Sequence, residues 1–130
     1  MLQANRVGMQ TVLATDVGAG TSFSLLRTMG EAYKVQQLGG YPMSVFESLY
    51  KCTLGAAKAL HLDDEIGCFG KGRKADFIVI DYAVTPSQQV RMDYLKHHEK
   101  WTLENKLFGL QTIGDDRNIL ATYIVGRRMK

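Results

Sequence analysis

The sequence lacks most of the features that mark a membrane-spanning, secreted or nucleic-acid-binding protein. No apolar run approaches the ~18 residues that a membrane helix needs, and Met1–Arg6 shows no charged-then-apolar signal pattern. The two cysteines, Cys52 and Cys68, lie in a chain large enough to bury an ordinary core, which favours a reducing cytoplasm. The net charge is only +3, and basic residues gather only at Arg127–Arg128 and Lys130. We therefore expect neither a nucleic acid nor a membrane as a partner.

Several catalytic and ligand-binding motifs are missing as well. The sequence has no Gly-x-Ser-x-Gly nucleophile motif. Gly70–Lys74 precedes a predicted strand and lacks the Walker spacing, so we expect a tight turn there. Asp63–Glu65 lacks the alternating ligands of a calcium loop and is predicted to be a solvated turn. His97–Glu99 contains His-x-Glu without the downstream Pro-Cys-x-x-Cys of zinc nucleobase deaminases, which favours a solvated segment. Three further candidates have a spacing unlike that of a zinc site: Cys52, His61 and Cys68.

What the chain does contain is a globular composition with alternating helical and strand patterns. At 130 residues, 45% hydrophobic and 22% charged, it has the size of one ordinary domain. Hydrophobic periodicity, turn residues and a Ser44–Glu47 capping box together predict seven elements. We expect strands over Arg6–Ala14, Ala75–Asp81 and Asn118–Val125, and helices over Phe23–Leu38, Ser44–Cys52, Leu54–Leu60 and Thr102–Ile113. The polar stretch Gln88–Lys100 receives no assignment.

The chain is organised around Thr11–Ser22, where a short β-branched run meets a glycine-rich turn. Asp16 interrupts the run, and Thr21 or Ser22 can cap the helix that follows. A carboxylate at the carboxyl end of a parallel strand stands where α/β enzymes keep their chemistry. Asp16 is therefore a candidate metal ligand and proton carrier, because a carboxylate beside a metal-bound water can take and return its proton. The local sequence is equally compatible with a helix cap or a turn-forming aspartate.

Three stretches of the chain carry a resemblance to a known family. The first is Ala14–Met29, which runs on into Glu31–Gln37, and the second is Ile66–Asp81, with its Lys-Ala-Asp strand. The third is a set of short motifs toward the end of the chain: Lys106–Phe108, Gly114–Arg117 and Tyr123–Gly126. From about Val7 onward, the sequence closely resembles the guanine deaminases of the amidohydrolase superfamily.

This resemblance implies an α/β fold, in which a (β/α)8 barrel is joined to a β-sandwich assembled from both ends of a longer chain. Residues 1–65 would be the last barrel strand and the helices that follow it. Residues 66–130 would be the C-terminal sandwich strands with one helix, 102–113. The resemblance also implies zinc-dependent hydrolysis of guanine to xanthine and ammonia, a step of purine catabolism. Asp16 would lie at the end of the eighth strand as zinc ligand and proton shuttle.

The largest departure from the family is one of length. A (β/α)8 barrel needs about 200 residues or more, so this chain resembles only a C-terminal portion. The family's zinc-binding histidines and its glutamate have no counterpart, and none of the three histidines, His61, His97 and His98, stands at a matching position. A catalytic zinc ion takes about three protein ligands, and a single carboxylate supplies only one of them. We therefore expect the chain alone to bind no zinc and to be inactive, and we assign no guanine-binding residue.

The short length of the chain relative to the family also determines which partners we expect. A barrel strand without its neighbours has open edges that invite pairing with another chain. We expect self-association into a homo-oligomer, or dependence on a missing N-terminal portion. Two alternatives remain open: a non-catalytic binding or assembly module, and one half of a split enzyme.

Overall fold

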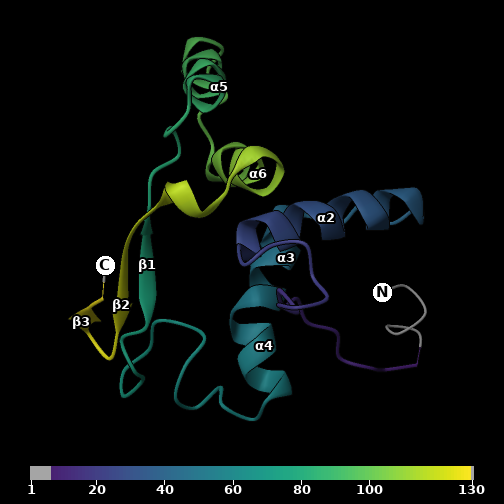
Figure 1. The fold of residues 1–130 in the computed structure, drawn as a ribbon, viewed down its shortest axis with the longest axis vertical. Helices are drawn as coiled ribbons and strands as arrows, with labels where there is room; N and C mark the ends of the chain where they lie inside the picture. The colour runs from purple at the N-terminus through teal and green to yellow at the C-terminus, as the bar shows by residue number, and fades with distance from the viewer. Residues whose placement is uncertain (1–6, 130) are drawn as a thin grey trace.

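A computed structural model describes residues 7–129, with a group of helices on one side and a small antiparallel sheet on the other (Figure 1). The elements follow one another as α2 (Leu25–Leu38), α3 (Val45–Cys52), α4 (Leu54–Ala59), β1 (Phe77–Ile80), α5 (Pro86–His97), α6 (Leu103–Ile113), the 3-10 turn η1 (Asp116–Asn118), β2 (Ile119–Ile124) and β3 (Arg127–Arg128). In Figure 1, α5 lies at the end of the long axis, beyond α6. The fold is thus mixed α/β, as the sequence predicts.

The core lies where α2, α3 and α6 meet. Four apolar side chains form its buried centre: Leu26, Met29, Val45 and Leu110. Gly30 of α2 faces α6 so closely that a Cβ there would lie 2.6 Å from the carbonyl oxygen of Gln111. A glycine inside a helix costs about 1 kcal/mol relative to alanine. Here it allows the two helices to approach, and Tyr33 packs edge-on against Phe108 beside it.

The sheet confirms the two later predicted strands. Its order is β1-β2-β3, with both pairs antiparallel. Phe77 stands opposite Tyr123, and their rings stack with centroids 4.4 Å apart. The register shifts between Val79 and Ile80, and Ile80 then pairs with Ile119 at the end of β1. Ile80 packs against the helical core, so the end of β1 joins the two sides of the molecule.

The predicted helices are confirmed, although their capping differs from the expectation. Ser44 Oγ accepts the Glu47 amide at 3.1 Å, but the Glu47 carboxylate accepts the Tyr41 hydroxyl at 2.8 Å instead of completing the capping box. The N-cap residue of α2 is Ser24, whose side chain makes no capping bond. Ser22 Oγ accepts the Ser24 amide at 3.0 Å. The expectation that Thr21 or Ser22 caps this helix is therefore wrong.

The strand expected over Arg6–Ala14 is also wrong within the described residues. Residues 7–14 form no strand, and Arg6 lies outside the described part of the chain. A strand exists only through its ladder of hydrogen bonds to a neighbour. The apolar run is present, but within residues 7–129 no β-strand pairs with it.

The structure adds one helix that the sequence analysis did not assign. Thr85 Oγ1 accepts the Gln88 amide at 3.3 Å and Pro86 occupies the first turn, so α5 begins with a strong start signal. The helix buries only Gln88, Met92 and Leu95, which is too narrow an apolar stripe to be recognised by periodicity. The region 66–130 consequently carries two helices, α5 and α6, where one was expected.

A buried polar cluster joins α5 to the rest of the fold. The Gln88 amide nitrogen donates to the Ile113 carbonyl at 2.9 Å and to Asn118 Oδ1 at 3.1 Å. The Asn118 amide nitrogen donates to the Asp81 carbonyl at 2.7 Å, and its Oδ1 accepts the Asp115 amide at 3.0 Å. Because each of these buried groups has a partner, the cluster fixes where β1, α5, α6 and η1 meet.

The remaining loops agree with the predicted turns. Asp63–Glu65 forms a turn, and the Arg73 amide donates to the Gly70 carbonyl at 3.1 Å within Gly70–Lys74. Within residues 7–129, no helix combines the length and the apolar character that crossing a bilayer requires.

Candidate functional site

Asp16 lies exposed in the loop that leads into α2. Its backbone has a φ of +47°, in the left-handed region that aspartate tolerates better than most residues. Its carbonyl oxygen accepts the amides of Ala19 and Gly20, which closes a tight turn. Because Ser24 is the N-cap residue of α2, the helix-cap interpretation of Asp16 is wrong, and the turn-forming interpretation describes its backbone.

The turn after Asp16 depends on Gly20. A Cβ at this position would overlap the Thr15 carbonyl oxygen and lie 3.0 Å from the Asp16 carbonyl oxygen. A backbone group cannot move aside as a flexible side chain can, so glycine is required there. The glycines that made this stretch conspicuous in the sequence therefore shape the loop that presents the Asp16 carboxylate to solvent.

The described residues do not complete a zinc site. Within residues 7–129, no group of three or more His, Cys, Asp or Glu side chains comes together as a metal site would require. His61 is exposed in a turn, and His97 and His98 are exposed at the end of α5. A catalytic zinc takes about three protein ligands. Asp16 can supply one of them at most, so we derive no reaction step through a metal for this chain.

The two thiols differ in their surroundings. Cys52 is half-buried against the core, and burial raises the pKa of its thiol to about 11. Because only the thiolate is a strong nucleophile, Cys52 is chemically quiet at neutral pH. Cys68 is exposed in the loop before β1. Neither thiol belongs to a catalytic arrangement with Asp16.

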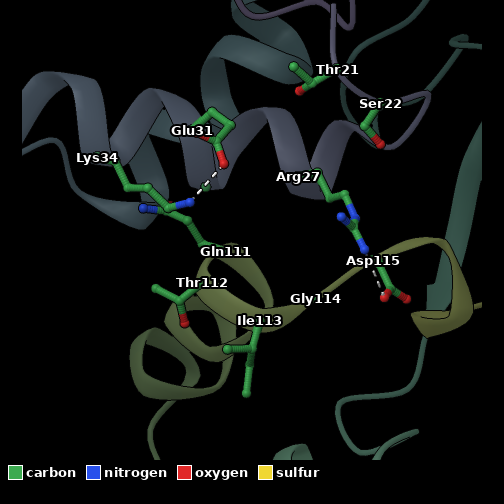
Figure 2. Close-up of a pocket in the computed structure, with 11 residues that line it drawn as sticks. Thr21, Ser22, Arg27, Glu31, Lys34, Gln111, Thr112, Ile113, Gly114 and Asp115 are labelled. Atoms are coloured by element: carbon green, nitrogen blue, oxygen red, sulfur yellow. Dashed lines mark hydrogen bonds and ion pairs between the residues drawn. The ribbon is translucent and has the colours of Figure 1, made fainter.

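A polar cleft of about 500 Å³ lies between α2 and α6 (Figure 2). Some of its lining residues follow the Asp16 turn along the chain. Thr21 and Ser22 line one end, but Asp16 is not among the lining residues. Figure 2 shows Arg27, Glu31 and Lys34 on the α2 wall, facing Gln111 to Ile113 on the α6 wall. The cations are matched by acids, since Lys34 pairs with Glu31 at 2.7 Å. Sequence reasoning did not indicate this cleft.

Asp115 is the most strongly perturbed acid of the described part. Its side chain is 7% exposed, and its carboxylate accepts the Arg117 Nη2 at 2.7 Å, the Arg117 Nε at 3.0 Å and the Arg117 amide at 3.0 Å. Arg27 lies 3.7 Å away from the same carboxylate. The hydrogen bond from the Arg117 side chain is the main cause that lowers the pKa of Asp115 to about 2. The contact between Arg27 and Asp115 lies at the lining of the cleft and links α2 to the start of η1.

Solved structures contain the same arrangement of helices and strands. E. coli guanine deaminase matches with a TM-score of 0.90 and 46% identity, over 99% of this chain and 29% of that one. A guanine deaminase from C. acetobutylicum with guanine bound in its active site matches at a TM-score of 0.66 and 26% identity, over 97% and 28%. An adenosine deaminase from Xanthomonas campestris with bound zinc has a TM-score of 0.71 and 18% identity, over 95% and 26%, which shows the fold alone. These matches place the chain in the class of α/β proteins with the amidohydrolase fold.

The sequence comparison gives the family itself. The amidohydrolase family matches residues 2–129, and the chain belongs to this family. The curated guanine deaminase of Escherichia coli (strain K12) is 50% identical over 122 residues, which cover 94% of this chain and 26% of that protein. The chain spans about a quarter of the length of this and other curated guanine deaminases that it matches.

Proposed function

We propose that this chain forms part of a guanine deaminase, which hydrolyses guanine to xanthine and ammonia in the breakdown of purines. The observation that carries the proposal is the 50% identity to the E. coli guanine deaminase across nearly the whole chain. In the reaction, a C–O bond forms from water and the C–N bond to the exocyclic amine breaks. The attacking water must lose a proton, and the departing amine must gain one.

Asp16 is the residue of this chain that we propose for that proton transfer. Its exposed carboxylate lies on a hydrogen-bonded turn, from which it would accept the proton of the attacking water and return it to the leaving amine. We also propose Asp16 as one ligand of a catalytic zinc ion. The other ligands would come from polypeptide outside this chain, because the described residues supply no further candidates.

We further propose that catalysis requires a partner. The chain spans about a quarter of the relative, and the completing polypeptide would supply the guanine pocket and the remaining metal ligands. If the completing polypeptide is encoded separately, this chain is one half of a split enzyme. The free thiols of Cys52 and Cys68 support a cytoplasmic location, where cysteines stay reduced.

The test is complementation. The chain is mixed, with added zinc, with E. coli guanine deaminase from which the matched 122 residues have been removed, and guanine absorbance and ammonia are followed. We expect no turnover from either piece alone and turnover from the mixture. Asp16→Asn in this chain should lower kcat by about 10²–10⁴-fold, the range of a lost general base.

The matched control is Asp64→Asn, which changes an exposed aspartate in a turn away from the Asp16 loop. It should leave turnover unchanged. Turnover by the chain alone would contradict the need for a partner. Full activity of the Asp16→Asn mixture would overturn the role of Asp16. A mixture that forms a stable complex without turnover would favour the non-catalytic assembly module.

A further inference from the structure

Lys51 is a buried cation on the helical side of the fold. It lies in the last turn of α3, and its side chain is only 9% exposed. Lysine is rarely buried, because removing an ammonium from water is costly unless partners replace the lost hydration. The hydrogen-bond partners of Lys51 therefore indicate which part of the fold its buried ammonium holds in place.

Those partners lie on the segment that leads to Asp16. The Lys51 ammonium donates to Thr11 Oγ1 at 2.8 Å and to the Thr11 carbonyl oxygen at 3.1 Å. The Lys51 carbonyl oxygen accepts the Leu13 amide at 3.1 Å. One residue of α3 thus holds this segment through both its side chain and its backbone, three residues before Asp16.

Lys51 is itself held in place from the other side. Glu47 Oε1 lies 3.7 Å from the Lys51 ammonium, one helical turn away on α3. Glu47 Oε2 accepts the Tyr41 hydroxyl at 2.8 Å, and the Glu47 amide donates to Ser44 Oγ. The hydrogen bond to Glu47 raises the pKa of Tyr41, so the phenol stays protonated and keeps donating. A polar chain therefore runs from the α2–α3 loop through α3 to Thr11.

Within the described part of the chain, few other hydrogen bonds fix this segment. Residues 9–16 belong to no helix or strand, and within residues 7–129 the hydrogen bonds that tie Thr11 and Leu13 to the helices all go to Lys51. The Leu13 side chain adds a contact with the core. Without the ammonium, Thr11 would lose both of its bonds, and the bond from the Leu13 amide would be left as the link between these two residues and α3.

We propose that Lys51 is a positioning residue, which fixes Thr11 to Leu13 on α3 and thereby sets where the Asp16 carboxylate stands. This inference rests on the proposed function, because a carboxylate that moves protons must be held within a fraction of an ångström of its working place. The role is distinct from catalysis, since Lys51 acts on the reaction only through the segment that it holds.

The first measurement uses the 130-residue chain and amide hydrogen exchange. Lys51→Met keeps the length of the side chain and removes its charge and donors. We expect exchange at residues 11–16 to rise about tenfold or more, since it reports local opening, while α6 stays unchanged. Lys58→Met, an exposed lysine on the neighbouring helix α4, is the matched control and should change neither region.

The second measurement uses the complemented enzyme. Lys51→Met should lower kcat by about 10- to 100-fold, as for other supporting residues of active sites, with the KM for guanine within about twofold because guanine binds elsewhere. Lys51→Arg retains a charged donor and should restore most of kcat. A merely structural role would lower the amount of folded enzyme without this separation of kcat from KM.

Thr11→Val keeps the proposal testable if Lys51→Met fails to fold, because it removes only the hydroxyl acceptor. We expect it to raise exchange at residues 11–16 by a smaller factor. Exchange and kcat equal to those of Lys58→Met would overturn the proposal, as would unchanged exchange in a folded Thr11→Val chain. A complemented wild-type enzyme without turnover would remove the proposed function, while the exchange data would still decide whether Lys51 anchors the segment.

Discussion

At the scale of single residues, charge pairs and glycines matter more than the histidines that first attract attention. His61, His97 and His98 are all exposed and take part in no cluster of possible metal ligands within the described chain. Asp115 and Lys51, by contrast, are buried charges with several partners each. A buried charge is expensive and persists only where partners compensate it, so these two residues mark what the fold must hold in place.

Asp115→Asn should destabilise the chain by about 1–3 kcal/mol at neutral pH, the range for hydrogen bonds to charged groups. The pKa of Asp115 is lowered to about 2 in the folded chain, against an ordinary value of 3.8. Its carboxylate therefore contributes stability above pH 4, and this contribution is lost as the pH falls from about 4 to about 2. Urea unfolding of both chains at several pH values measures the difference.

The control for this prediction is Asp116→Asn, the adjacent and exposed aspartate. It should change stability by less than about 0.5 kcal/mol, as surface substitutions do. A difference in stability between wild type and Asp115→Asn that stays constant from pH 7 down to pH 2 would contradict the lowered pKa of Asp115.

At the scale of elements, the sequence predicts helices and strands that local residue patterns specify. It does not predict whether a strand finds a neighbouring strand to pair with. The periodic stripe of α2, the start of α3 at Ser44 and the apolar run of β1 are all local signals, and each element formed where expected. Arg6–Ala14 carries an equally good strand pattern, but a strand needs a neighbour, which the pattern does not encode. The prediction missed α5 for a different reason. The start of this helix carries a clear local signal, but its buried face contains a glutamine and therefore lacks a continuous apolar stripe.

Gln88 and Gln89 offer a matched pair for testing the polar cluster. The Gln88 side chain is 1% exposed and bonds to Ile113 and Asn118, while the exposed side chain of Gln89 donates to Asp93. Gln88→Ala leaves buried partners unsatisfied, at roughly 1–3 kcal/mol for each. Gln89→Ala should cost less than about 0.5 kcal/mol.

Thermal and urea unfolding of the two variants would measure the difference. If the variants were equally stable, the cluster would not be what fixes α5 to α6.

The candidate site was predictable in part for related reasons. Asp16 stands out because glycines follow it, and Gly20 is indeed required by the turn. The anchoring of its segment by Lys51 was not predictable, because Thr11 and Lys51 lie 40 residues apart and no local pattern joins them. The cleft between α2 and α6 likewise depends on the packing of distant helices.

At the scale of the whole molecule, much apolar surface is left uncovered. Leu38 is 90% exposed and Phe23 is 87% exposed. Phe23 also borders an apolar cavity of about 660 Å³ between the start of α2, α3 and the sheet, which Leu25 and Ile78 line as well. Extended apolar patches on a soluble protein mark surfaces that another polypeptide covers, which supports the proposal of a partner.

We expect the isolated chain to self-associate as its concentration rises, because apolar surface is then buried between copies. Sedimentation velocity over a concentration series measures this. Phe23→Ser should weaken the association, while Val90→Ser, an exposed valine on the distant helix α5, should change it less. The completing piece of the E. coli relative should replace the self-associated species by one defined complex. A chain that stays monomeric throughout would contradict the expectation.

The two thiols differ in exposure, so chemical labelling of the cysteines can be used to follow changes in the structure. Cys68 is exposed, so an alkylating fluorophore can be attached there. Cys52 is half-buried against the core and lines the same cavity as Cys68, and its pKa of about 11 makes its thiol slow to react. The rate at which a second label enters the molecule therefore reports access to that cavity, and a partner that covers the cavity would slow that rate.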